Sequence, residues 1–309
     1  MLRAEDVSVS FAGGARVLDE VTLGLAAGRK TCVIGETGSG KSMLLLTILG
    51  LLGPGAAVSG RILMDGLDLL RLSPRELRKA RKERLSYIPQ GSGNGLNPLY
   101  TAGSQLTELI RFHREVPQGE AVSLAGSLLA QAGLDDPFRV MASYPFQLSG
   151  GMRQRVLAAM GLSGEAPILL VDEPTKGLDR ARIDLMAALF RGIEGKSMLC
   201  VTHDLRFARQ VADSVAVLYS SELIEEGSCG EFYSGPLHPY SRAMLAALPE
   251  NGLKAEAGFA PPRSGKVAAG GCAFASRCRE AVPRCLRGRP PLIAAGNRRV
   301  RCWKHAPEP

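Results

Sequence analysis

Short runs of consecutive apolar residues occur at 168–171, 198–201 and 215–218, separated by longer stretches of mixed polarity. An uninterrupted apolar run of this length is typical of a strand that is buried on both faces of a parallel sheet. The stretches between the runs have the length and the mixed polarity of helices. This alternation of strands and helices predicts an α/β domain with a mostly parallel sheet.

The N-terminal part of the chain shows a different pattern. Val7, Val9 and Phe11 alternate with polar residues and are followed by Gly13 and Gly14. Alternation with a period of two indicates a half-buried strand, and paired glycines favour a tight turn. We therefore predict a strand and a hairpin at the start of the chain.

The middle of the chain contains further elements. Residues 29–34 predict a short buried strand, and an apolar helix begins near Lys41. The highly charged residues 74–84 predict an exposed helix, and residues 86–90 predict a strand that ends in a loop. From about residue 91 to 166 the pattern is helical and interrupted by glycine and proline, which indicates an inserted helical subdomain.

The composition is that of an ordinary globular protein, with 45% hydrophobic and 22% charged residues. The longest apolar run, about residues 43–52, is interrupted by Thr47 and Gly50 and is shorter than the ~20 residues that a bilayer requires. The first six residues contain no apolar signal region. We expect the chain to stay in the cytoplasm and to reach a membrane only through a partner.

The formal net charge of +8 is concentrated near the C-terminus. Residues 263–309 contain 11 basic and two acidic residues, a net charge of +9, so the rest of the chain is nearly neutral. A basic tail suits nucleic acid, an anionic membrane surface or an anionic cofactor. A merely solvated basic face is an equal alternative.

A glycine-rich loop joins the strand 29–34 to the helix that follows it. The loop fits the phosphate-binding pattern G-x-x-x-x-G-K-[ST] at every position. In this pattern backbone N–H groups turn toward phosphate oxygens, the lysine reaches the β- and γ-phosphates, and the serine ligates Mg²⁺. The N-terminus of the helix adds positive potential at the same place. The residues are Gly35, Glu36, Thr37, Gly38, Ser39, Gly40, Lys41 and Ser42.

Polar side chains end three of the predicted strands. Asp172 and Glu173 follow the run 168–171, His203 ends the next run, and Gln90 ends the strand 86–90. Asp172 is placed to hold Mg²⁺ through water, and Glu173 is suited to polarise the attacking water. His203 can bind the γ-phosphate or position the water, and Gln90 can bind both Mg²⁺ and the water. Because ligands of open parallel sheets bind at the carboxyl ends of the strands, we predict one site for these side chains.

A family resemblance connects these motifs. Residues 148–155, Leu-Ser-Gly-Gly-Met-Arg-Gln-Arg, resemble the signature of ABC ATPases. The phosphate loop, Gln90, the acid pair, Leu178-Asp179 and His203 stand in the order of the cassette of that family. The resemblance covers about residues 1–250. It implies a P-loop NTPase fold with a RecA-like core and an inserted helical subdomain.

The resemblance also implies how the cassette works. Two cassettes pair head to tail, and each ATP lies between the phosphate loop of one subunit and the signature of the other. Ser149 and the backbone amides of Gly150 and Gly151 are suited to grip the γ-phosphate from the opposite side. ATP would hold the dimer closed, and hydrolysis would release it.

Other positions of the cassette are matched less fully. Phe11 fits the aromatic position that stacks on adenine, although a core phenylalanine is the alternative. Asp179 is retained in the loop after the acid pair. Lys176 and Gly177 replace the small polar pair of many relatives, a departure that bears on contacts across the dimer.

Two segments narrow the resemblance to ATPases of importers for oligopeptides, dipeptides and nickel. Residues 235–245 are similar to the His-Pro-Tyr hallmark of this group, and residues 96–98 supply its Asn-Pro turn after Gln90. The resemblance implies a peripheral ATPase at the cytoplasmic face of the inner membrane, with peptides, nickel or metal-chelate (metallophore) complexes as cargo. It implies as partners a second ABC ATPase, with a heterodimer favoured, two transmembrane permeases and an extracytoplasmic substrate-binding protein.

Four of the seven cysteines, Cys272, Cys278, Cys285 and Cys302, form a C-x5-C-x6-C-x16-C pattern. Disulfides are improbable in the cytosol, whereas four thiolates suit zinc or an iron–sulfur cluster. The absence of C-x2-C pairs favours a cluster over zinc, and in peptide-importer ATPases the same pattern is associated with a [4Fe–4S] cluster. Four free structural cysteines are the alternative. Cys32 and Cys200 lie in apolar runs and are expected to be core thiols.

The predicted organisation is an ABC ATPase domain over residues 1–234 and a small cysteine-rich extension over residues 235–309. Residues 252–271 are rich in glycine, alanine and proline and are interpreted as a linker. The main alternative is a soluble ABC ATPase that acts on nucleic acid or ribosomes. Such proteins usually carry two cassettes or a long coiled coil, so no nucleic-acid partner is expected. An exporter cassette and a non-catalytic nucleotide sensor are further alternatives.

Overall fold

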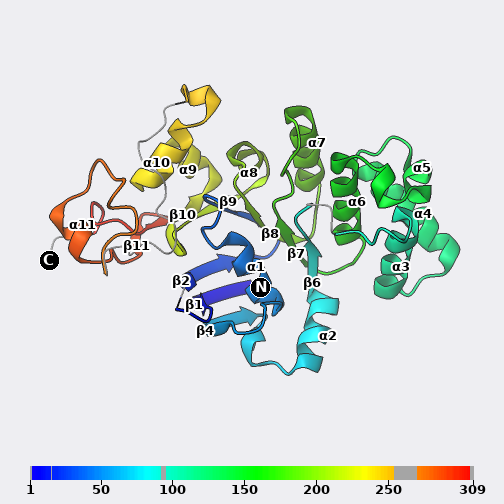
Figure 1. Cartoon of the computed structure of the whole chain (residues 1–309), viewed down its shortest axis with the longest axis horizontal. Coiled ribbons are helices and arrows are strands. Elements are labelled where there is room, and N and C mark those ends of the chain that lie inside the picture. Colours follow the sequence, from blue (N-terminus) through cyan, green and yellow to red (C-terminus); the bar gives the residue numbers. More distant parts are fainter. Residues whose placement is uncertain (1, 15, 92–94, 254–269, 307–309) are drawn as a thin grey trace. The chain divides into compact units, whose positions relative to one another are not determined.

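The computed structural model describes residues 2–14, 16–91, 95–253 and 270–306. The chain forms two compact units, and Figure 1 labels their elements where there is room. The first unit comprises Met1–Leu25, Thr31–Leu70 and Ala212–Pro309, and the second comprises Ala26–Lys30 and Arg71–Val211. Residues 254–269 of the expected linker lie outside the described residues.

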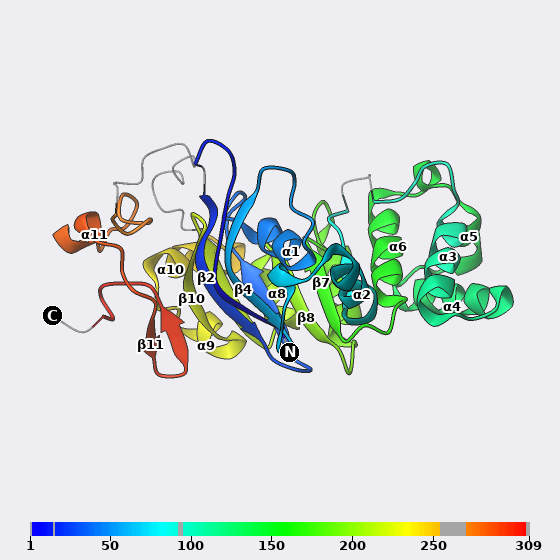
Figure 2. The same cartoon turned by 90° about the horizontal axis from the view of Figure 1, so that it is seen from below.

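The first unit contains an antiparallel sheet in the strand order β2-β1-β4-β5. Its strands are β1 (Leu2–Ser10), β2 (Arg16–Leu25), β4 (Ala57–Met64) and β5 (Leu67–Asp68). Strands β1, β2 and β4 lie side by side in Figure 2. Val7 and Val9 are fully buried, as their alternation with polar residues predicts. The predicted strand and hairpin are confirmed.

A second set of strands in this unit surrounds the one that precedes the phosphate loop. Strand β3 (Lys30–Ile34) pairs in parallel with β9 (Ser214–Tyr219), and β10 (Glu222–Ser228) pairs with β9 antiparallel. Two short strands, β11 (Ile293–Ala295) and β12 (Arg298–Val300), extend the sheet from β10. The helices of the unit are α1 (Lys41–Leu49), α9 (Cys229–Ser234), α10 (Pro239–Ala246) and α11 (Pro283–Arg287), with 3₁₀ turns at Leu69–Arg71 and Pro249–Asn251.

Within the second unit, three parallel strands run in the order β8-β7-β6: β6 (Leu85–Ile88), β7 (Ile168–Asp172) and β8 (Ser197–Thr202). Every residue of β7 and β8 is buried, which confirms the predicted double-sided burial of these apolar runs. Cys200 is fully buried on β8, as expected for a core thiol. Helices α7 (Arg180–Arg191) and α8 (Leu205–Val211) follow β7 and β8.

The predicted helical stretch contains α3 (Ala102–Arg114), α4 (Gln118–Gln131), α5 (Pro137–Ala142), a 3₁₀ turn (Pro145–Gln147) and α6 (Gly150–Leu162). These helices gather together in Figure 1 and share a core that includes Leu106, Leu129 and Val156. Thr101 and Ser149 cap α3 and α6, because each side-chain oxygen accepts a backbone N–H three residues on.

The charged segment 74–84 forms helix α2 (Pro74–Arg84), which buries no side chain. A capping box at its start compensates for the missing apolar face: the Ser73 N–H donates to the Glu76 carboxylate over 2.8 Å, and Ser73 Oγ accepts the Glu76 N–H. The predicted exposed helix is therefore confirmed. In the part of the chain that the structure describes, no helix is both long and apolar enough to cross a membrane.

Candidate functional site

The phosphate loop connects β3 to α1 and is packed too closely for side chains at two of its glycines. A Cβ on Gly35 would lie 2.1 Å from the Leu218 carbonyl oxygen, and one on Gly40 would lie 2.4 Å from the Val17 carbonyl oxygen. Gly40 also has a φ of 107°, which L side chains rarely adopt. The backbone can therefore follow this path only with glycine at both positions.

Cationic and polar groups converge on the loop. Lys41 is buried, and its ammonium group donates to the carbonyl oxygens of Gly35 (2.8 Å) and Glu36 (2.9 Å). The Ser39 hydroxyl is buried and has no hydrogen-bond partner among the described residues. Ser42 is half-buried in the first turn of α1, while Thr37 and Gly38 are exposed. A buried cation, an unsatisfied hydroxyl and a helix N-terminus fit a phosphate ligand.

The second unit brings Glu173 and His203 together. Glu173 follows β7 with a left-handed φ of 48° and is 7% exposed. Its Oε2 lies 2.6 Å from Nδ1 of His203 and accepts the backbone N–H of His203 over 3.3 Å. The Glu173 carboxylate at the end of β7 is thus held by His203, the residue that follows β8.

Asp172 and Gln90 lie at the same ends of their strands. Asp172 is buried at the end of β7, and Gln90 is half-buried two residues after β6. Burial raises the pKa of the Tyr87 hydroxyl to about 12, and the charge of Asp172 and its hydrogen bond to Tyr87 add to this shift. The Asp172 carboxylate therefore lies next to the Tyr87 hydroxyl of β6.

Gln154 is a buried residue of α6 that the sequence analysis did not single out. Its amide donates to the carbonyl oxygens of Glu173 (3.2 Å) and Pro174. A Cβ on Gly91, the residue after Gln90, would lie 3.1 Å from the Gln154 side chain. The signature helix is thereby tied to the loop that carries Glu173. Its place within residues 148–155 was the available signal, but nothing in the sequence indicated these contacts.

Two of the three signature residues at the start of α6 are exposed. Ser149 and Gly150 are exposed at the start of α6, whereas Gly151 is buried. Asp179 caps α7: its Oδ1 accepts the Arg182 N–H over 3.0 Å, and its Oδ2 pairs with the Arg182 guanidinium at 3.1 Å. Lys176 and Gly177 are exposed in the loop before it.

Phe11 lies in the turn after β1, half-buried, and its carbonyl accepts the Gly14 N–H over 3.0 Å. Phe11 therefore lies in the turn between β1 and β2, in the unit that contains the phosphate loop. Contact of the ring with adenine stays a prediction.

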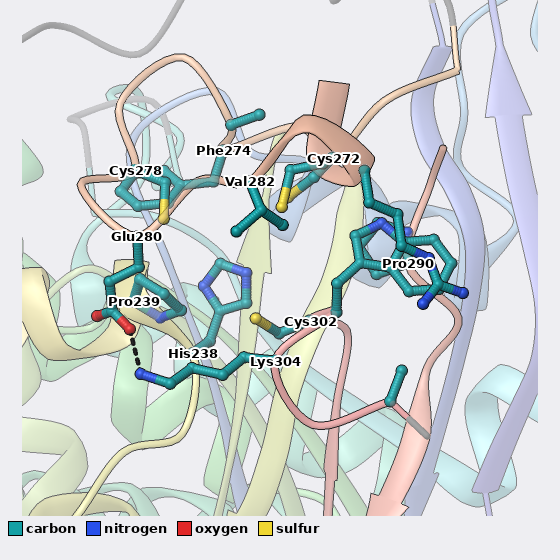
Figure 3. A pocket seen from close by; sticks show the side chains of 15 residues that line it. His238, Pro239, Cys272, Phe274, Cys278, Glu280, Val282, Pro290, Cys302 and Lys304 are labelled. Carbon is teal, nitrogen blue, oxygen red and sulfur yellow. Dashed lines mark hydrogen bonds and ion pairs between the residues drawn. The ribbon is translucent and has the colours of Figure 1, made fainter. Parts of the chain in front are cut away.

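The four tail cysteines line one cavity of about 490 Å³ (Figure 3). All four thiols are free, and burial raises the pKa of Cys272 to about 11 and also raises those of Cys278 and Cys302. Among the described residues, no three histidine, cysteine, aspartate or glutamate side chains gather closely enough to hold a metal ion. The cavity offers donors of the right kind for zinc or a cluster, but not in the arrangement of a metal centre.

Comparison with known families decides between the interpretations of the nucleotide site. A family model described as ABC transporter matches residues 18–176. The chain belongs to the ABC transporter family. A second model, described as oligopeptide/dipeptide transporter, C-terminal region, matches residues 224–285 and so includes three of the four tail cysteines. The family activity is ATP hydrolysis coupled to transport, with ATP and Mg²⁺ as ligands, which favours a transporter subunit over a soluble ATPase.

The two bacterial transport proteins described first below match nearly the whole chain, and the solved structure matches about three quarters of it. The dipeptide transport ATP-binding protein DppD of Bacillus subtilis is 36% identical over 98% of this chain and 94% of its own length. The oligopeptide transport ATP-binding protein AppD of the same organism is 34% identical over 94% of this chain and 92% of its own. A dimeric ATP-binding cassette solved with ADP and Pi is 30% identical, covers 74% of this chain and 99% of its own, and has a TM-score of 0.66.

Proposed function

We propose that this chain is the ATP-hydrolysing subunit that powers a peptide importer of the cytoplasmic membrane. The observation that carries the proposal is the buried Glu173 carboxylate, whose Oε2 lies 2.6 Å from His203 at the carboxyl end of β7. This arrangement suits a group that accepts a proton from water and is oriented by a neighbouring imidazole. We further propose a cassette over residues 1–234 and an extension over residues 235–309.

The other residues have defined roles in this proposal. The backbone of residues 35–40 and the Lys41 ammonium group bind the β- and γ-phosphates, and Phe11 stacks on adenine. Ser42, Gln90 and Asp172 would hold Mg²⁺, which would supply positive charge next to the phosphate groups. Glu173 takes a proton from the attacking water. His203 orients the Glu173 carboxylate and binds the γ-phosphate.

A second cassette completes the site in this proposal. The exposed Ser149 and Gly150 bind the γ-phosphate held by the phosphate loop of the partner. Asp179 contributes to nucleotide binding in the loop that contacts the partner cassette. The solved cassette with ADP and Pi, which is 30% identical to this chain, is itself dimeric, and this supports the pairing of two cassettes. We favour a heterodimer of two ATPases, bound at the cytoplasmic face of the membrane to two permeases that receive cargo from an extracytoplasmic binding protein.

Peptides are the cargo class that the relatives support. The two bacterial relatives described above carry dipeptide transport and oligopeptide transport in their names. Nickel and metal-chelate complexes, which the sequence left open, have no such support. Uptake of a labelled dipeptide by cells with and without this chain tests the cargo class.

The [4Fe–4S] cluster, with zinc as the alternative, stays a prediction that rests on the cysteine pattern. The basic tail would offset the charge of four thiolates. Anaerobic purification followed by an absorbance spectrum and metal analysis separates a cluster, zinc and free thiols.

Replacing Glu173 with glutamine tests the proposed function. Glu173→Gln removes the proton acceptor and keeps the shape, so ATP turnover should fall by roughly 10²- to 10⁴-fold while MgATP binding persists. The matched control is Glu165→Gln, an exposed glutamate before β7 whose loss should leave turnover unchanged. Hydrolysis by Glu173→Gln at the wild-type rate would remove Glu173 from the mechanism. Absence of MgATP binding by the wild-type chain would refute the function itself.

A further inference from the structure

Two side chains from the C-terminal part of the chain reach the second residue of the phosphate loop. The backbone N–H of Glu36 donates to the hydroxyl of Tyr240, on α10, over 3.1 Å. The guanidinium of Arg277 donates to both carboxylate oxygens of Glu36, at 3.1 and 3.4 Å. Both contacts lie within the first unit. They join the loop to the segments that carry the His-Pro-Tyr motif and the cysteines.

The two side chains are held in place by an aromatic cluster. The Tyr240 ring lies 4.5 Å from that of Tyr219, at the end of β9, and 5.6 Å from that of Phe274. Arg277 donates a further hydrogen bond to the Tyr219 hydroxyl over 3.3 Å, and its guanidinium lies 5.6 Å from the Phe274 ring centre. The Arg277 side chain is only 13% exposed, so its position is set by these partners.

The charge of Glu36 gives these contacts a consequence for the ligand. Glu36 is the single acidic residue in the loop 35–42, beside the place where the phosphates of MgATP are proposed to bind. A carboxylate there repels an anionic ligand, and because the Glu36 side chain is 37% exposed, solvent and salt screen part of this repulsion. Arg277 supplies the compensating positive charge through one guanidinium nitrogen, Nη1, which lies within hydrogen-bond distance of both carboxylate oxygens.

We propose that Arg277 and Tyr240 are positioning residues of the nucleotide site. Arg277 offsets the charge of Glu36, and Tyr240 holds the peptide N–H of Glu36, so that the loop accepts a polyphosphate. This inference rests on the proposed function, because its ligand is MgATP. A purely architectural role, in which the same contacts only anchor the C-terminal segments, is the alternative.

A double-mutant cycle that removes the two charges singly and together distinguishes the two roles. In the purified full-length chain, Arg277→Met should weaken MgATP binding by roughly three- to tenfold, because Glu36 is left uncompensated. The same change combined with Glu36→Gln should return the affinity to within about twofold of wild type, since the repelling charge is gone. Arg277→Lys keeps the charge and should retain most of the affinity. The loss should also shrink as salt is raised.

Tyr240→Phe tests the second contact independently. It removes the hydroxyl that accepts the Glu36 N–H but leaves the aromatic packing, and it should weaken MgATP binding by a few-fold. The control is Arg287→Met, another arginine of the C-terminal segment, whose side chain is exposed on α11. This variant should bind MgATP like wild type.

The outcomes separate this inference from the proposed function. If wild type binds MgATP and Arg277→Met binds it equally well, the inference is overturned. It is also overturned if the loss persists in the double variant, since an architectural defect is not repaired by removing the Glu36 charge. If Arg277→Met does not fold, Arg277→Lys and Tyr240→Phe carry the test. If the wild-type chain binds no MgATP, the proposed function fails instead.

Discussion

Replacing Gln154 with leucine should loosen the loop that carries Glu173. Gln154 is 3% exposed, and its amide donates to the carbonyl oxygens of Glu173 and Pro174. The Glu173 carbonyl also accepts the Lys176 N–H over 3.3 Å, so it keeps one donor in the variant. The Pro174 carbonyl loses the donor that the Gln154 amide supplies. Leucine has a similar volume, so the change removes donors without opening a large cavity.

The magnitude follows from these contacts. A buried carbonyl deprived of its partner costs about 1–3 kcal/mol, and a lost hydrogen bond whose acceptor retains another donor costs about 1 kcal/mol. We therefore expect Gln154→Leu to lower the free energy of unfolding by roughly 2–4 kcal/mol. Since a displacement of about 1 Å at a catalytic group can cost about 10²-fold in rate, ATP turnover should fall more than MgATP binding.

Urea unfolding followed by far-UV circular dichroism measures the stability, and steady-state ATP hydrolysis measures turnover. The matched control is Gln131→Leu on the exposed face of α4, which should change the unfolding free energy by no more than about 0.5 kcal/mol. If Gln154→Leu unfolds like the control and hydrolyses ATP like wild type, Gln154 does not hold the loop and the reasoning fails.

Two further predictions concern the second unit. A Cβ on Gly161 of α6 would lie 2.2 Å from Ile88 at the end of β6, so Gly161→Ala should lower the unfolding free energy by about 1–3 kcal/mol. Gly119→Ala on the open face of α4 should instead be neutral or stabilising, and equal effects in the two variants would contradict this packing argument. Burial and the charge of Lys82 lower the pKa of His113, so the native state disfavours its protonation. The stability this contributes is present above the unfolded pKa of about 6.5 and is lost as pH falls below it. Unfolding free energies at pH 7 and pH 5 should therefore differ less in His113→Asn than in wild type, and an unchanged difference would count against the shift.

The sequence predicted the elements whose burial follows from a continuous pattern of apolar and polar residues. The apolar runs of β7, β8 and β9 and the alternating residues of β1 needed only local periodicity, and the phosphate loop is recognisable because its glycines, lysine and serine stand at set spacings. Glu173 and His203 were placed together because the ends of neighbouring parallel strands meet.

Other features depend on partners that are distant in sequence. Strand β12 (Arg298–Val300) contains two arginines, so its hydropathy pattern does not predict a strand. Its pairing depends on a distant partner, since Arg299 forms an ion pair with Glu226 on β10. Gln154 reads as an ordinary polar helix residue until its two carbonyl partners are known. The contact between Arg277 and Glu36 joins residues 241 positions apart and has no local signature.

That separation has a consequence for how the protein is made. Residue 36 leaves the ribosome long before residue 277, and long-range contacts form late because the intervening chain must first be ordered. The phosphate loop therefore passes most of synthesis with an unpaired carboxylate, and it reaches its final electrostatic state only when the C-terminal segment docks. If Arg277 offsets Glu36 as proposed, full nucleotide affinity requires the finished chain, and nascent cassettes would compete poorly for cellular ATP.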